Sequence, residues 1–421
     1  MTHSTWTEKM AFYQGLNPHE LVKRFGSPLY VYNERILRER CRELRQLSNL
    51  DSFAVNYSVK ANTNPNLIRI VREEGLRSDA MSPGELEMDL LAGYSPEEIL
   101  YISNNNTESE MRHALEKGCL ISVDSLSQLE MLGKIKRGSS VMVRVNPGIG
   151  EGHHAKVITG GAKSKFGIDP RKLGNVLELL DKYELVLKGV NQHIGSLFMQ
   201  PDNYLAACEV LLQIVDHLPS SAFSTLEIID FGGGFGIPYH KHDGEERLDM
   251  AALGAGLHQL LSDWLSRTHY GGSFLVEPGR YVMAECGQLL GTVTAIKDNG
   301  HIRFAGTDIG FNVLMRPMLY DAWHDIEVYC RGEKDTPIKQ TVVGNICESG
   351  DILAKDRLLP PMEPGDIIAV LDAGAYGFSM ASNYNERLLP AEILLQENGS
   401  IRVIRRRQTL ADLKITLTDL D

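Results

Sequence analysis

The stretch FAVNYSVKANTNPNLIRIVREEGLRSDAM, residues 53–81, contains a predicted strand, a helix and a second strand in direct succession. Residues 53–60 are rich in β-forming side chains, and residues 64–75 carry apolar side chains at helical spacing between an opening asparagine and a closing glycine. Residues 76–81 form the next predicted strand. A strand, a helix and a strand in this order are typical of a βαβ unit with parallel strands.

The same alternation continues along the chain. Further strands are predicted at 99–104, 119–125, 140–147, 187–195, 226–234 and 273–279. Most of the intervals show helical spacing, and the helices at 82–93 and 107–118 open with Ser or Thr and close with Gly, as helix ends commonly do. Eight strands that alternate with helices predict an α/β fold, a parallel (β/α)8 TIM-like barrel rather than an open doubly wound sheet.

The pattern changes after residue 280, where β-rich runs follow one another with few helical intervals. These runs are HIRFAG (301–306), KQTVVGNI (339–346), DIIAVLDAG (366–374), AEILLQ (391–396) and SIRVIRRR (400–407). The glycine turns KDNG (297–300) and QENGS (396–400) predict hairpins. We therefore expect a barrel domain over residues 27–280 and a mostly β, β-barrel-like domain over 281–421, with residues 1–26 packed on the latter.

Composition excludes several classes of protein. The 421 residues are 43% hydrophobic, enough to bury more than one core, and the net charge of −12 argues against nucleic acid as a partner. No run of about 18 apolar residues and no secretory leader is evident, so we expect a cytoplasmic protein that binds a small molecule and no membrane. The six cysteines are scattered, so neither a disulfide framework nor a metal site is indicated; they are Cys41, Cys119, Cys208, Cys286, Cys330 and Cys347.

Polar side chains gather at the C-terminal ends of the predicted barrel strands, where barrel enzymes place their chemistry. They are Lys60, Asp79, Asn104, Asp124, Asn146, His193, the glycines of GGGFG and Glu277. Any one of them has an alternative interpretation, because loops also begin at strand ends. Lys60, His193 and Glu277 together with a glycine loop favour an active site.

The glycine loop DFGGGFG (230–236) follows the seventh strand, where converging backbone N–H groups can bind an anion such as phosphate. A lysine at the mouth of a barrel that holds a phosphate suits pyridoxal phosphate, because the amine of Lys60 can form a Schiff base with the aldehyde. Glu277 near the pyridine nitrogen would favour the protonated ring. His193 could stack on the ring face, or it could be a structural histidine of the barrel wall.

Several motifs occur in the order found in one enzyme family. They are YSVKAN (57–62), HIGS (193–196), DFGGGFG, EPGR (277–280), MRP (315–317), CESGD (347–351), GAYG (374–377) and SNYN (382–385). In these the chain resembles the diaminopimelate decarboxylases, which belong to the alanine-racemase-like, fold type III family of pyridoxal phosphate enzymes. The similarity runs from about residue 20 to IRRRQTLADL (404–413), and residues 144–168 look like the flexible loop of that family.

The resemblance implies decarboxylation of meso-diaminopimelate at its D-configured carbon, which gives L-lysine and carbon dioxide in the last step of lysine biosynthesis. It also implies a homodimer with active sites between subunits. The cofactor-binding residues implied are Lys60, Asp79, His193, Ser196, Gly233, Gly234, Gly236, Glu277, Gly279, Arg280 and Tyr376. Those implied for the substrate are Arg280, Arg316, Tyr320, Glu348 and Tyr376. Cys347 is implied as the proton donor, and Cys347 and Glu348 come from the other subunit.

Other functions compete with this one. The residues Leu197 and Asn345 and the string TDIGFN (307–312) depart from the usual family wording, which leaves open a paralogue for ornithine, arginine or a siderophore intermediate. Such a paralogue would be expected to change Arg316 and Glu348, and both are present. A racemase usually pairs the pyridine nitrogen with arginine, not with a residue such as Glu277. A pyridoxal phosphate carrier would have no use for the extra β domain.

Overall fold

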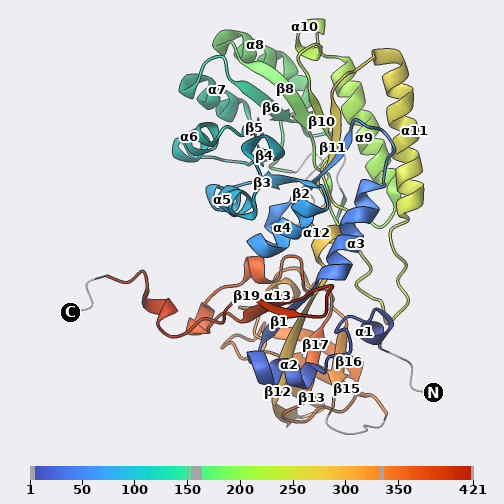
Figure 1. The fold of residues 1–421 in the computed structure, drawn as a ribbon, viewed down its shortest axis with the longest axis vertical. Coiled ribbons are helices and arrows are strands. Elements are labelled where there is room, and N and C mark those ends of the chain that lie inside the picture. Colours follow the sequence, from blue (N-terminus) through green and yellow to red (C-terminus); the bar gives the residue numbers. More distant parts are fainter. Residues whose placement is uncertain (1–4, 149–150, 153–163, 331–335, 419–421) are drawn as a thin grey trace. The chain divides into compact units, whose positions relative to one another are not determined.

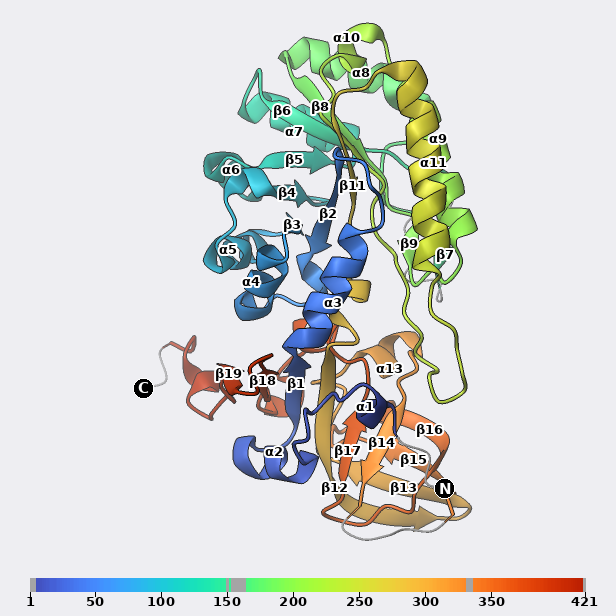
Figure 2. The same cartoon turned by 45° about the vertical axis from the view of Figure 1, so that its right-hand side comes forward.

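The computed structural model describes residues 5–148, 151–152, 164–330 and 336–418. It divides the chain into two compact units, each described by itself below (Figures 1 and 2). The β unit comprises Met1–Leu37, Pro238–Glu246 and Met283–Asp421, and the barrel unit comprises Arg38–Ile237 and Arg247–Val282. Most of the predicted flexible loop, at 149–150 and 153–163, lies outside the described residues.

Eight strands of the barrel unit, all among the described residues, pair in parallel and close into a barrel. In order around the barrel they are β2 (Phe53–Ser58), β3 (Arg77–Ala80), β4 (Ile99–Ile102), β5 (Leu120–Val123), β6 (Ser140–Arg144), β8 (Val186–Asn191), β10 (Ile228–Asp230) and β11 (Ser273–Val276). Each overlaps one of the eight strands predicted from the sequence. The predicted (β/α)8 barrel is therefore confirmed. Leu100, Met142, Ile228 and Leu275 form a buried cluster.

Most of the helices lie around the outside of these strands (Figure 1). The helices are α3 (Glu34–Arg45), α4 (Pro65–Glu73), α5 (Pro83–Ala92), α6 (Glu108–Lys117), α7 (Leu126–Ile135), α8 (Leu173–Tyr183), α9 (Pro201–Asp216), α10 (Ser220–Phe223), α11 (Met250–Thr268) and α12 (Arg280–Met283). The side chains of Asn64, Ser82 and Thr107 accept hydrogen bonds from the first turns of α4, α5 and α6. The capping signals read from the sequence thus mark real helix starts.

The described residues of the β unit form a nine-stranded mixed sheet. Its strands are β1 (Leu29–Asn33), β12 (Gly287–Asn299), β13 (Ile302–Thr307), β14 (Ile326–Tyr329), β15 (Ile338–Val343), β16 (Ile352–Leu359), β17 (Ile367–Val370), β18 (Ala391–Leu395) and β19 (Ile401–Arg405). The pairs β12–β13 and β18–β19 are antiparallel and join at the KDNG and QENGS turns, so both predicted hairpins are confirmed. The short helices α1 (Trp6–Lys9), α2 (Pro18–Phe25) and α13 (Arg316–Tyr320) also belong to the β unit. In the barrel unit, β7 (Glu151–Gly152) pairs with β9 (Gly195–Ser196).

Strand β1 corrects the domain limits expected from the sequence. We expected the barrel domain to begin at residue 27 and predicted no strand at 29–33. In the structure β1 is fully buried between β12 and β18 of the β unit. Residues 238–246 also belong to the β unit. The N-terminal segment contacts the β unit, since the backbone N–H of Thr7 donates to Glu327 Oε1 at 3.2 Å.

In the parts of the chain that the structure describes, none of the helices has the length and apolar character needed to span a bilayer. A search of the same residues finds no cluster of three or more side chains suited to a metal ion. No disulfide joins any two of the six cysteines, all of which lie in the described part of the chain.

Candidate active site

Several predicted site residues lie at the C-terminal end of the barrel, because parallel strands in a closed barrel end at the same rim. Lys60 lies in the 3₁₀ turn Val59–Ala61 that follows β2, and Asp79 lies in β3 itself. His193 follows β8, the glycine loop follows β10, and Glu277 follows β11 directly. This arrangement agrees with the prediction that the polar residues at the C-terminal strand ends lie close together.

Asp79 and Glu277 lie beside Lys60. Ser58 Oγ lies 2.7 Å from Asp79 Oδ2 and 3.1 Å from the backbone oxygen of Glu277, so one hydroxyl connects the ends of β2, β3 and β11. Burial raises the pKa of Asp79 well above its usual value, the charge of Glu277 raises it further, and Lys60 acts in the opposite direction. The half-buried lysine therefore faces two nearly inaccessible carboxyl groups.

Glu277 has an unusual environment. It is 4% exposed, and its Oε1 has no hydrogen-bond partner among the described residues. Burial raises its pKa well above the usual value, the neighbouring Asp230 raises it further, and the charges of Lys60 and Arg144 oppose these effects. Burial also raises the pKa of Asp230, to about 6. A buried polar atom without a partner is costly, so Oε1 is suited to pair with a polar atom of a ligand.

His193 is held as a neutral imidazole. The backbone N–H of Gly233 donates to its Nδ1 at 3.0 Å, so the proton of the neutral ring is on Nε2. Burial lowers the pKa of His193 well below its usual value, and the charges of Lys60 and Arg144 lower it further. The ring is still partly accessible to solvent. An uncharged, partly accessible ring can lie against a flat ligand.

The glycine loop is packed tightly against neighbouring backbone. A Cβ atom on Gly233 would lie 1.9 Å from the backbone oxygen of Glu277, and one on Gly236 would lie 2.5 Å from that of Phe198. Gly234 has a φ of 110°, which other residues rarely adopt. Close packing alone requires these glycines, and an anion-binding role is compatible with it.

Arg280 and Ser196 are paired at the same end of the barrel. Arg280 Nη2 donates to Ser196 Oγ at 2.9 Å, which joins the start of α12 to β9. A Cβ atom on Gly279, the residue before Arg280, would lie 3.0 Å from the Cβ of Ser58. Ser196 and Arg280, two of the predicted cofactor-binding residues, are thus in contact with each other.

The remaining predicted residues belong to the β unit. Arg316 and Tyr320 lie on α13, Cys347 and Glu348 lie in the loop before β16, and Tyr376 follows β17. Arg316 is 1% exposed, whereas Cys347 and Glu348 are exposed in the single chain. The predicted site residues therefore fall into two sets, one in each unit.

The exposed pair Cys347 and Glu348 is held by the SNYN motif. The hydroxyl of Tyr384 donates to Glu348 Oε1 at 2.6 Å, and the backbone N–H of Cys347 donates to Asn385 Oδ1 at 2.8 Å. Asp351 orders the loop from inside, because its two oxygens accept from the N–H groups of Phe311 and Ile346, both at 2.7 Å. Neither Tyr384 nor Asn385 of the SNYN motif is among the site residues predicted from the sequence.

Sequence reasoning missed Arg144, the last residue of β6. Burial lowers its pKa, while Glu277, Asp124 and other carboxyl groups raise it. Its Cζ lies 4.7 Å from the centre of the Phe166 ring. The sequence does carry a signal, because Arg144 lies at the end of a strand, but the predicted strand extends to residue 147 and its terminal polar residue is Asn146.

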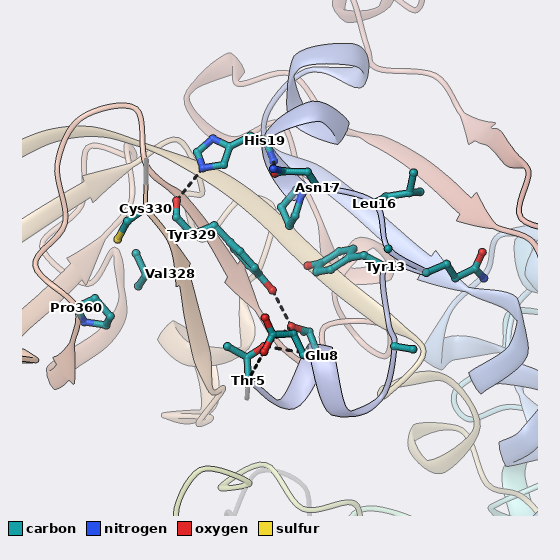
Figure 3. Close-up of a pocket in the computed structure, with 15 residues that line it drawn as sticks. Thr5, Glu8, Tyr13, Leu16, Asn17, His19, Val328, Tyr329, Cys330 and Pro360 are labelled. Carbon is teal, nitrogen blue, oxygen red and sulfur yellow. Dashed lines mark hydrogen bonds between the residues drawn. The ribbon is translucent and has the colours of Figure 1, made fainter. Parts of the chain in front are cut away.

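A pocket of about 830 Å³ in the β unit holds none of the predicted site residues (Figure 3). It is lined by the N-terminal segment, β14 and Pro360. Its polar groups are already bonded to protein, since His19 Nε2 pairs with the backbone oxygen of Tyr329 at 2.9 Å and the hydroxyl of Tyr329 donates to Glu327 Oε2 at 2.9 Å. These polar groups therefore differ from Glu277 Oε1, which has no hydrogen-bond partner among the described residues.

Comparisons with known proteins show the family to which the chain belongs. Residues 34–284 match the family model described as "Pyridoxal-dependent decarboxylase, pyridoxal binding domain". Diaminopimelate decarboxylase of Methanothermobacter thermautotrophicus is 42% identical over 403 residues, covering 95% of this chain and 93% of the relative. The enzyme of Escherichia coli K12 is 34% identical, covering 93% and 94%. The crystal structure of the Helicobacter pylori diaminopimelate decarboxylase complexed with L-lysine is 30% identical, with a TM-score of 0.86 and coverage of 94% and 98%.

The closed barrel and the match over residues 34–284 show that the chain is a pyridoxal-dependent decarboxylase. Such a cofactor needs an amine, a polar group opposite its ring nitrogen and a seat for its phosphate, and Lys60, the orphaned Oε1 of Glu277 and the Ser196–Arg280 pair fit these needs. Within that class the chain belongs to the diaminopimelate decarboxylase family.

Proposed function

We propose that the chain decarboxylates meso-diaminopimelate to L-lysine and carbon dioxide, the last step of lysine biosynthesis, with pyridoxal phosphate as cofactor. The observation that carries the proposal is the meeting of Lys60, His193 and Glu277 at one end of the barrel in a chain of this family. Both Arg316 and Glu348 are present. We would expect different residues at these positions in a decarboxylase whose substrate has a different remote end.

When bound, pyridoxal phosphate supplies an electron sink for the carbanion left by decarboxylation. Lys60 would hold it through its amine, and Glu277 Oε1 would pair with the ring nitrogen. His193, as a neutral ring, would lie against the flat face. Ser196, Arg280 and the backbone of the loop containing Gly233, Gly234 and Gly236 would bind its phosphate, with Asp79, Gly279 and Tyr376 nearby.

The remaining residues act on the substrate. The bond between the reacting carbon and its carboxylate breaks, its electron pair stays with the carbon, and the Cys347 thiol gives the proton that replaces the carboxylate. Arg316 would bind the remote carboxylate, because a guanidinium offers two parallel N–H donors. Glu348 would bind the remote ammonium, with Arg280, Tyr320 and Tyr376 completing the site. Binding at the remote end fixes the orientation of the reacting end.

This function requires a homodimer, in which Cys347 and Glu348 serve the partner's barrel. Their exposure in the single chain supports that role, since both side chains are accessible to a second copy. The cytoplasmic location expected from the sequence is part of the same proposal.

The test is product analysis of the purified, cofactor-loaded protein. It receives meso-diaminopimelate, lysine, ornithine and arginine separately, and carbon dioxide and amines are followed by mass spectrometry. We expect lysine from diaminopimelate and no comparable turnover of the other three. Turnover of ornithine or arginine in preference to diaminopimelate would contradict the proposed substrate and indicate a paralogous decarboxylase.

A further inference from the structure

The guanidinium of Arg316 is fixed by two aromatic side chains of the β unit. Its Nη1 lies 2.7 Å from Nε2 of His324. Its Cζ lies 4.6 Å from the centre of the Tyr239 ring, within the range of a cation–π contact. One neighbour therefore lies at the edge of the guanidinium and the other near its face.

The hydrogen bonds of His324 define its protonation. Nδ1 lies 2.7 Å from the backbone oxygen of Leu371, which can only accept, so Nδ1 carries a proton. Arg316 can only donate, so Nε2 must accept and carry no proton. His324 is thus a neutral imidazole that accepts a hydrogen bond from a cation. A buried guanidinium is more commonly paired with a carboxylate.

His324 is itself rigidly placed. It is 1% exposed, and the next residue, Asp325, accepts a 2.9 Å backbone hydrogen bond from Leu371 N–H. Tyr239 packs edge-on against the imidazole, with centroids 5.2 Å apart and planes at 80°. The backbone of Leu371 therefore fixes His324, and His324 in turn fixes one edge of Arg316.

We propose that His324, protonated on Nδ1, is the positioning residue that orients Arg316 for a substrate carboxylate. The proposal rests on the function proposed above, in which Arg316 binds the non-reacting end of the substrate. A carboxylate is bound by two parallel N–H groups only when the plane of the guanidinium is set. A neutral partner sets that plane without competing for the positive charge, as a carboxylate in its place would.

Two substitutions separate the two hydrogen bonds of His324. In His324→Asn the amide nitrogen can replace Nδ1 as donor to Leu371, but nothing replaces the acceptor for Arg316. In His324→Gln the amide oxygen can reach the position of Nε2 and accept from Arg316. The exposed helix residue His258, changed to Asn, is the matched control.

The measurement is equilibrium binding to the cofactor-loaded enzyme of two ligands, L-lysine, which keeps the remote carboxylate, and 1,5-diaminopentane, which lacks it. We expect H324N to weaken L-lysine about tenfold, the size of a lost hydrogen bond to a charged group, and to change diaminopentane less than about threefold. H324Q should keep L-lysine within about threefold of wild type. For turnover of diaminopimelate, H324N should raise KM more than it lowers kcat.

A double-mutant cycle tests whether His324 acts through Arg316. In an Arg316→Ala background, H324N should cause no further loss of L-lysine binding. Additive losses, equal losses for both ligands, or unchanged L-lysine binding in H324N would overturn the proposal. Should H324N fail to bind cofactor, His324→Phe keeps the ring shape without an acceptor and carries the same expectation. A wild-type enzyme that neither binds L-lysine nor forms it would instead overturn the proposed function.

Discussion

The backbone N–H of Gly233 donates to Nδ1 of His193 at 3.0 Å, which joins the loop after β10 to the loop after β8. This bond sets the tautomer of a histidine at the cofactor end of the barrel. It also satisfies a backbone donor in a loop where added side-chain atoms would meet neighbouring backbone. One contact therefore has both a structural and a chemical role, and the two can be separated by mutation.

His193→Ala should destabilise the apoenzyme, because it leaves the N–H of Gly233 without its acceptor. We expect a loss of about 1–2 kcal/mol in the free energy of unfolding, measured in urea. His193→Asn, whose amide oxygen can occupy the position of Nδ1, should recover most of this stability but not the activity. Equal stability of H193A and wild type would show that the bond contributes nothing to the fold.

Lys60→Ala should abolish the visible absorbance of the lysine-bound cofactor, because no other amine is proposed to hold it. The exposed Lys172, changed to Ala, is the control and should keep the absorbance. Titration of each protein with pyridoxal phosphate, followed by absorbance, makes the comparison. Retention of the band in K60A would mean that a different lysine holds the cofactor.

The sequence predicts the barrel well because its signals are local. Helices alternate with the barrel strands, and the caps of α4, α5 and α6 lie where Asn64, Ser82 and Thr107 predict them. Strand β1 was missed for the opposite reason. Its partners, β12 and β18, come hundreds of residues later in the chain, and nothing in LYVYN indicates which sheet it joins.

The candidate site shows the same division. Lys60 and Glu277 were found because they end predicted strands, whereas Cys347, Arg316 and Tyr376 came only from the family resemblance. No periodicity could indicate that Tyr239, in a connection after β10, would lie over the guanidinium of Arg316. Contacts of this kind depend on tertiary packing, which local pattern does not encode.

Arg316→Ala should weaken use of diaminopimelate far more than cofactor binding. We expect kcat/KM to fall by a factor equivalent to ~2–4 kcal/mol, since a charged, hydrogen-bonded pair with the remote carboxylate is lost. The exposed Arg171, changed to Ala, is the control. An unchanged kcat/KM in R316A would remove Arg316 from the substrate site.

Lys241→Met should strongly destabilise the β unit. Lys241 Nζ lies 3.0 Å from Glu285 Oε1 and 2.5 Å from Asp372 Oδ1, and all three side chains are almost inaccessible. Removing the cation leaves two buried carboxylates uncompensated, which costs about 3–5 kcal/mol. Urea denaturation measures this loss in the free energy of unfolding, and the Lys172→Ala variant, changed at an exposed position, is the reference. A loss below about 1 kcal/mol would show that the carboxyl groups find other compensation.

Asp372 should make the free energy of unfolding of the β unit depend on pH. Burial raises the pKa of its carboxyl to about 6, with Lys241 opposing, whereas an unfolded Asp titrates near about 3.9. Between these values the folded chain holds a proton that the unfolded chain does not. This contribution to the free energy of unfolding therefore falls as pH rises from about 4 to about 6, by at most ~1.4 kcal/mol per pH unit. Asp372→Asn should lack this slope, and an unchanged slope would contradict the assignment.

Mixing two inactive variants tests whether the active site is shared between subunits. Lys60→Ala removes the lysine of the barrel unit that we propose holds the cofactor, and Cys347→Ala removes the exposed thiol of the β unit. If Cys347 serves the partner's barrel, each hybrid dimer holds one site with both residues intact and one site with neither. Random exchange of an equal mixture then restores about a quarter of the wild-type activity, because half of the dimers are hybrids.

The outcome depends on which residues share a site. If Cys347 served the barrel of its own chain, every site in the hybrid would lack either the lysine or the thiol, and the mixture would stay inactive. Cys347→Ala mixed with itself, and K60A mixed with itself, are the controls for exchange without complementation. Subunit exchange is verified separately by mass spectrometry of differently tagged copies. Exchange without recovered activity would place Cys347 at its own barrel, whereas a Cys347→Ala variant that is active by itself would remove the thiol from catalysis.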